Sequence, residues 1–339
     1  MNIKTPFTKI KSRYDLFLKR RPHRSFRQTR RRDYVRKLEL PGYFAFTKYV
    51  SKIIWANRKT FIFLALLYAV MTVLMVGIGS QDIYTTIKDA LDTTNGGLLS
   101  GGFGEIGKAG LLFVTAATGG ISLSLTEAQQ VYAGIITLIT WMTSIWLLRN
   151  ILAGHKVKLR DGLYSAGSPI ISTFIIALVL IVQMLPLALA LIGYGAASVT
   201  GLLEGGVESM LFWAAAGLLA MLSLYWATST FFALVIVTLP GMYPFQALKT
   251  AGDLVIGRRL RILLRLLWML IVTAVTWAII MIPIIMLDSW VKSFWVDSVW
   301  VPTIPIVLLF ISAFTIVWVS SYIYLLYRKV VADDAEPAL

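Results

Sequence analysis

Residues 257–287 read GRRLRILLRLLWMLIVTAVTWAIIMIPIIML, and in this stretch four arginines lead into a long apolar run. From Leu266 to Leu287 the run contains no Asp, Glu, Lys, Arg or His. A helix needs about 20 predominantly apolar residues to cross a hydrocarbon core of ~30 Å. The stretch therefore predicts a transmembrane helix that begins just after its arginines.

Five further apolar runs have a similar length. The whole chain is 58% hydrophobic and has a mean hydropathy of +0.75, which excludes a soluble domain of 339 residues. A transmembrane barrel would instead show short alternating segments separated by turns. We therefore predict an all-α, polytopic transmembrane helical bundle. Its six spans lie near residues 60–79, 131–148, 169–194, 210–239, 266–287 and 302–326.

The charges indicate how these spans are oriented. Of the 32 lysines and arginines, all but Lys88, Lys108 and Lys292 fall in segments on one side of six spans. Loops on the cytoplasmic side collect Lys and Arg. We therefore expect a multi-pass protein of a cell membrane, of the bacterial inner-membrane type, with both termini in the cytoplasm.

This topology divides the chain into three parts. Residues 1–45 form a basic cytoplasmic tail that we expect to be disordered, because blocks of like charge repel. Residues 46–329 form the transmembrane domain, and residues 330–339 form a short cytoplasmic tail. The outer loop 81–130 is rich in glycine, and its residues 98–125 either re-enter the membrane or form short external helices.

The basic tail needs an acidic partner to neutralise it. Anionic membrane lipids, an acidic protein surface and ribosomal RNA would each suit its charge. Its densest part contains Arg20, Arg21, Arg30, Arg31 and Arg32. The segment that follows, residues 38–60, reads as an amphipathic helix that lies in the membrane interface before the first span.

A second amphipathic segment precedes the fifth span. Its apolar residues recur at helical spacing from Ala247 to Val255, and Gly257 offers a stop or a bend. Beyond it, Arg258, Arg261 and Arg265 follow at i, i+3 and i+7 and lie on one stripe of a helix. A guanidinium group matches phosphate oxygens, so the stripe suits lipid headgroups; the alternative is a topology anchor with no ligand preference.

We add basic residues of the neighbouring cytoplasmic loop and of the amphipathic segment to this stripe. The candidate lipid-headgroup residues are Lys156, Lys158, Arg160, Lys249, Arg258, Arg259, Arg261 and Arg265.

A family resemblance appears in the same stretch. Residues 238–270, TLPGMYPFQALKTAGDLVIGRRLRILLRLLWML, resemble the cytoplasmic hairpin of bacterial six-helix membrane proteins related to the membrane domain of glycerophosphoryl diester phosphodiesterase. The positions that match are Ala247, Leu248, Ala251, Leu254, Gly257, Arg258 and Arg261. The resemblance implies a six-helix membrane fold of mostly uncharacterised role. It does not imply the phosphodiesterase reaction, which belongs to a separate soluble domain.

The residues needed for catalysis are scarce. The chain has no cysteine and only two histidines, His23 and His155, so neither a catalytic pair nor a metal site is suggested. We expect a non-enzymatic membrane protein without a cofactor or metal, whose basic cytoplasmic face binds anionic lipid headgroups in a scaffold or accessory role in the envelope. The alternatives are a transporter of a lipid or small apolar solute, and an adaptor whose basic tail docks a cytoplasmic partner or the ribosome.

Overall fold

The computed structural model describes residues 40–77, 126–200, 203, 206–295 and 303–335. Every secondary-structure element in this part of the chain is an α-helix, and six of the helices are long and apolar enough to cross a membrane. The predicted all-α, six-span fold is therefore confirmed. The long helices are α4 (Arg58–Met75), α7 (Glu127–Leu152), α9 (Ile170–Val199), α10 (Gly206–Ile236), α12 (Arg259–Phe294) and α13 (Thr303–Ala335). Residues 1–39 of the predicted basic tail and most of the glycine-rich outer loop lie outside the described residues. The predicted boundary of the tail at residue 45 is wrong, because a helix already begins at Tyr43.

Three shorter helices each precede a long one. They are α3 (Tyr43–Ala56), α8 (Leu159–Ala166) and α11 (Pro244–Val255). The chain turns from α3 into α4 at Asn57, whose side-chain amide donates to the Ile53 carbonyl at 3.1 Å. It turns from α11 into α12 at Gly257, whose φ of +78° suits a residue without a Cβ atom. The stop or bend predicted at Gly257 is thus confirmed, because α11 ends at Val255 and α12 begins at Arg259.

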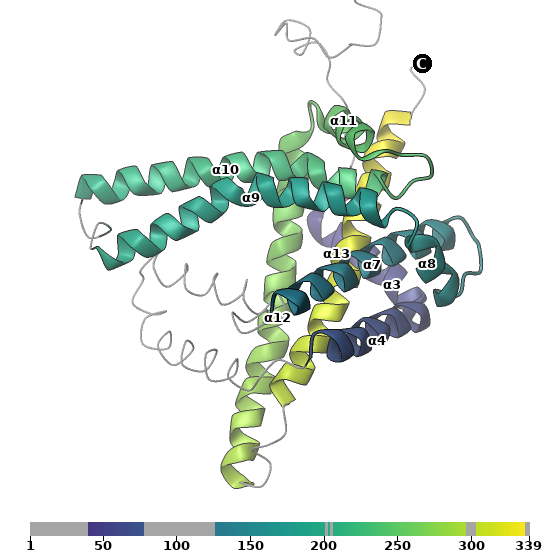
Figure 1. Ribbon diagram of the computed structural model, residues 1–339, viewed down its shortest axis with the longest axis horizontal. Helices are drawn as coiled ribbons and strands as arrows, with labels where there is room; N and C mark the ends of the chain where they lie inside the picture. The colour runs from purple at the N-terminus through teal and green to yellow at the C-terminus, as the bar shows by residue number, and fades with distance from the viewer. Residues whose placement is uncertain (1–39, 78–125, 201–202, 204–205, 296–302, 336–339) are drawn as a thin grey trace, which may run out of the picture.

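The long helices converge at one end and spread apart at the other (Figure 1). Helices α9 and α10 run side by side as a hairpin and cross α12 steeply near its first turns, while α12 packs along α13. Helices α4 and α7 pack on each other and on α13. The short helices α3, α8 and α11 all lie at the convergent end (Figure 1).

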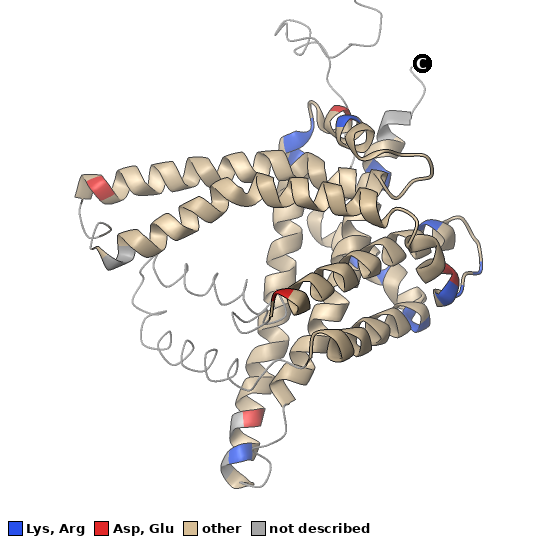
Figure 2. Cartoon of the chain, viewed as in Figure 1, with Lys and Arg blue, Asp and Glu red and all other residues tan. Residues whose placement is uncertain are grey.

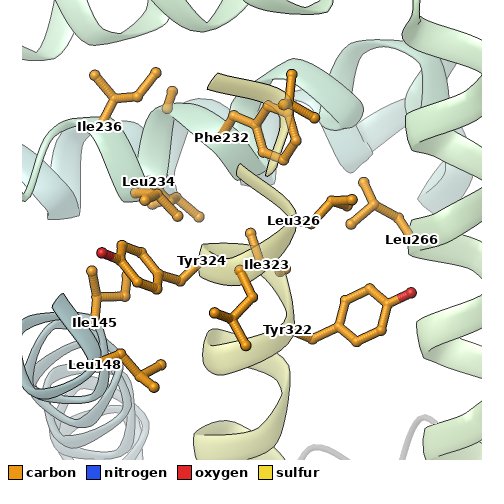
Figure 3. Close-up of a cluster of buried hydrophobic side chains, with 14 of the residues drawn as sticks. Ile145, Leu148, Phe232, Leu234, Ile236, Leu266, Tyr322, Ile323, Tyr324 and Leu326 are labelled. Atoms are coloured by element: carbon orange, nitrogen blue, oxygen red, sulfur yellow. The ribbon is translucent and has the colours of Figure 1, made fainter. Parts of the chain in front are cut away.

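The main core lies where α7, α10, α12 and α13 meet (Figure 3). Ile145, Phe232 and Tyr322 are fully or almost fully buried there. A smaller cluster, formed by Trp277, Met281, Ile304 and Leu308, joins the spread ends of α12 and α13. Many apolar side chains on the outer faces of the long helices are exposed, as expected for faces that contact lipid.

Polar side chains join the α9–α10 hairpin internally. The Thr230 hydroxyl donates to the side-chain oxygen of Gln183 at 2.6 Å. Pro186 lies inside α9, and the N–H of the next residue, Leu187, donates to the Ser223 hydroxyl at 3.0 Å. Neighbouring helices commonly satisfy backbone groups near a proline in this way. These polar side chains therefore form hydrogen bonds between α9 and α10.

Candidate functional site

Lysine and arginine gather at the convergent end of the bundle (Figure 2). They lie on the short helices α3, α8 and α11 and on the adjoining ends of the long helices, whereas the spread ends of α10 and α12 carry acidic residues. One further basic residue, Lys292, lies near the spread end of α12, where it pairs with Asp288 at 2.8 Å. The structure thus brings the eight candidate lipid-headgroup residues to one end of the molecule.

Arg258, one of the predicted headgroup residues, points into the protein. It follows the Gly257 turn, and only 2% of its surface is exposed. Its guanidinium donates to the carbonyl oxygen of Val330 at 3.2 Å, in the last turns of α13. A cation near a helix C-terminus also interacts favourably with the helix dipole. Arg258 therefore holds the start of α12 against the end of α13.

Arg265 is buried as well, with 7% of its surface exposed. Its guanidinium donates to the carbonyl oxygen of Pro41 and lies 4.1 Å from the centre of the Tyr43 ring. Its own backbone carbonyl accepts from the Tyr322 hydroxyl at 3.3 Å. Cation–π contact and a charge-assisted hydrogen bond together fix the start of α3 on α12.

A third arginine, Arg149, has a similar role, which the sequence analysis missed. It lies in the last turn of α7 and donates to the Thr238 carbonyl, just beyond the end of α10, at 3.3 Å. Arg149, Arg258 and Arg265 thus each donate to a backbone carbonyl at or near the end of another helix. We call them the clamp arginines. The sequence offers no signal for these pairs, because each acceptor is a backbone oxygen far away along the chain.

Arg259 occupies an intermediate environment. Its guanidinium carbon lies 4.0 Å from the centre of the Tyr225 ring, in the middle of α10. The residue is partly exposed. A guanidinium stacked on an aromatic face still has N–H groups along its edge that can donate to an anion.

The other predicted residues are exposed and fall into two groups. Lys156, Lys158 and Arg160 lie in and beside the loop that leads into α8, while Lys249 and Arg261 lie on α11 and on the first turn of α12. We call these the α8 group and the α11 group. Arg160 lies 3.8 Å from the Asp161 carboxylate, but the Arg160 side chain is 88% exposed, so the pair contributes little. The other four residues form no ion pair with any residue that the structure describes.

The remaining predictions concern other parts of the chain. Arg20, Arg21, Arg30, Arg31 and Arg32 of the basic tail lie outside the described residues. His155 is exposed in the loop before α8. Among the described residues, no group of three or more His, Asp or Glu is placed to hold a metal ion.

A shallow, mostly apolar groove of about 510 Å³ lies on the α9–α10 hairpin and is lined by Ile175, Leu178, Val179, Val182, Gln183 and Trp226.

Comparison with known proteins found no relative of this chain. No protein-family model, curated protein or solved structure matches the chain. The resemblance of residues 238–270 to the membrane domain of glycerophosphoryl diester phosphodiesterase stays a prediction from the sequence. What the structure shows is a helical protein with six candidate membrane spans. Of its eight predicted headgroup residues, Arg258 and Arg265 are buried, Arg259 is partly exposed, and the α8 and α11 groups are exposed.

Proposed function

We propose that this protein is a non-enzymatic integral membrane protein whose basic end binds the anionic headgroups of the cytoplasmic leaflet. It would serve as a scaffold or accessory protein in the envelope of a bacterial-type cell, with both termini in the cytoplasm. One observation carries the proposal: Lys156, Lys158, Lys249 and Arg261 are exposed at the convergent end and form no ion pair with a described residue.

The electrostatics favour a lipid ligand at this place. A basic residue near an anionic membrane surface contributes about 1 kcal/mol to binding, and the attraction falls off within a Debye length. The α8 group lies on the connection between α7 and α9, and the α11 group lies on the connection between α10 and α12 and on the first turn of α12. Residues at the ends of spans lie at the depth of the headgroups.

The burial of two clamp arginines reduces the number of residues that we propose to bind headgroups. Arg258 and Arg265 already donate to backbone carbonyls and have almost no exposed surface, so we leave them out of the proposed site. Arg259 contributes only the edge of its guanidinium. The proposed headgroup ligands are therefore Lys156, Lys158, Arg160, Lys249, Arg259 and Arg261.

Native mass spectrometry of the full chain, released gently from membranes, tests the proposal. One variant reverses the α8 group (Lys156→Glu, Lys158→Glu, Arg160→Glu) and another reverses the α11 group (Lys249→Glu, Arg261→Glu). Lys88→Glu with Lys108→Glu is the matched control, because these lysines fall on the opposite side of the predicted spans. We expect each test variant to retain fewer anionic lipids than the unaltered protein, and the control to retain as many as the unaltered protein. Equal retention in all three would contradict the proposal.

The same spectra test the adaptor alternative. A variant that lacks residues 1–39 keeps both exposed groups, helix α3 and the Pro41 acceptor of Arg265, but loses the arginine-rich tail. If bound lipid remains and no other component is lost, the helical end is the functional element. If instead the full chain carries a protein or RNA that the truncated chain lacks, and neither form retains anionic lipid, the tail is the functional element and the lipid proposal is wrong.

A further inference from the structure

Helix α3 is attached to the bundle along one face. Phe46 and Val50 are fully buried, and the Phe46 ring packs edge-on against Tyr322 with centres 4.9 Å apart. The Trp268 indole of α12 donates to the Thr47 hydroxyl at 3.1 Å. These contacts, with the Arg265 clamp at its start, fix which side of α3 faces away from the protein.

The opposite side carries a regular stripe of aromatic and basic residues. Phe44, Lys48, Lys52 and Trp55 follow at i, i+4, i+8 and i+11, so they lie on one face of the helix. Trp55 is 69% exposed and both lysines are exposed, while Phe44, at the edge of this face, is 77% exposed even though its ring meets Trp268 of α12 edge-on, with centres 4.8 Å apart. We call these four residues the α3 stripe.

The charge around the stripe has one sign. Residues 40–60 contain no Asp or Glu. The guanidinium of Arg58 lies 5.7 Å from the centre of a Trp55 ring, and Arg58 and Lys59 are both exposed at the start of α4. Lysines flanked by large exposed aromatic rings are typical of helices that lie in the interface of an anionic membrane.

The orientation of α3 agrees with such a position. Figure 1 shows α3 passing behind α13 and crossing it, and its contacts with α13 confirm that the two helices touch. The chain then reverses at Asn57 and enters the span α4. This crossing, followed by the turn at Asn57 into a span, fits a helix that lies along the membrane surface.

We propose that the α3 stripe is an anchor in the headgroup layer of an anionic leaflet. Phe44 and Trp55 insert between lipids, and Lys48 and Lys52 bind the headgroup phosphates. The anchor shares no residue with the α8 or α11 group, and it would stand if lipid retention by those groups failed. It places a second lipid contact at the entry to the first span.

Site-directed spin labelling measures the depth of the stripe directly. The chain has no cysteine, so one introduced cysteine gives one labelled site in the full protein. Phe44→Cys, Lys48→Cys, Lys52→Cys and Trp55→Cys each keep three of the four stripe residues. His155→Cys, in the exposed loop before α8, is the control. The probes are nanodiscs of phosphatidylcholine with phosphatidylglycerol, molecular oxygen and a water-soluble nickel chelate.

We expect all four stripe labels to relax faster with oxygen and more slowly with the nickel chelate than the label at position 155. A stripe as accessible to the chelate as position 155 would overturn the anchor. Strong spin–spin broadening between copies would overturn it as well, because a second protein chain would then cover the stripe.

A charge reversal separates anionic headgroups from a purely apolar contact. In nanodiscs that contain phosphatidylglycerol, Lys48→Glu with Lys52→Glu should raise the nickel accessibility of a label at position 55. In phosphatidylcholine alone, the same reversal should change it much less. An equal effect in both lipids would refute the role of the lysines. The lipid-retention spectra of the α8 and α11 variants have a different readout, so the two proposals can fail separately.

Discussion

Three arginines at the start of α12 differ in what surrounds them. Arg258 and Arg265 are seven residues apart, so they point almost the same way from the helix, and both are buried. Arg261, three residues after Arg258, points about 60° to one side and is exposed. The end of α13 and the start of α3 cover the side of α12 that carries Arg258 and Arg265, and they leave the side that carries Arg261 open.

This difference shows that a basic residue near the end of a span can serve two purposes. A buried guanidinium donates to a backbone carbonyl at or near the end of another helix. An exposed one remains available to an anion. Three single substitutions along α12 test this division, and we give them in order of expected effect.

Arg258→Ala should have the largest effect on stability. The substitution removes the donor to the Val330 carbonyl and leaves a cavity in a fully buried place. Loss of a hydrogen bond from a buried charged group costs about 1.5–3 kcal/mol. We expect a lower unfolding temperature in detergent, measured by tryptophan fluorescence. A stability equal to that of Arg261→Ala would contradict the clamp.

Arg265→Lys should have an intermediate effect. Lysine keeps the charge but lacks the planar group that stacks on Tyr43 while donating to the Pro41 carbonyl. We expect about 1 kcal/mol of lost stability, of the order of one cation–π contact. A spin label at position 48 should also become more mobile, because the start of α3 is released. Unchanged mobility would mean that the Thr47 and Phe46 contacts hold α3 without the clamp.

Arg261→Ala should have the smallest effect on stability, within about 0.5 kcal/mol, as is usual for exposed positions. It should nevertheless weaken the retention of anionic lipid. The measurements are the unfolding temperature and the native mass spectrum of the same preparation. A large loss of stability without any change in bound lipid would place Arg261 among the clamps instead.

The sequence predicted the spans well because a span is a local property. Twenty apolar residues in a row suffice to identify it, and each predicted span overlaps one observed long helix. The ends were less accurate: the fifth span was predicted to begin at Leu266, but α12 begins at Arg259 and continues to Phe294. Apolar length alone does not mark where a helix continues beyond the hydrocarbon.

The division of the arginines was not predictable for the opposite reason. Arg258 and Val330 are 72 residues apart along the chain, and Arg265 and Pro41 are 224 apart. Neither acceptor is a side chain, so no pattern of residue types marks the pair. Charge counting assigns every basic residue near a span to the surface. Packing between helices that are distant along the chain then decides which of these basic residues are buried.

The unequal lengths of the long helices bear on how the protein would respond to its bilayer. Helix α4 has 18 residues and a length of about 27 Å, whereas α12 has 36 residues and a length of about 54 Å. The short helix matches the hydrocarbon thickness, and the long one fits only by tilting or by extending beyond it. A thicker bilayer would therefore draw α12 upright and leave α4 little changed. The angle between the α9–α10 hairpin and α12 would then vary with membrane thickness.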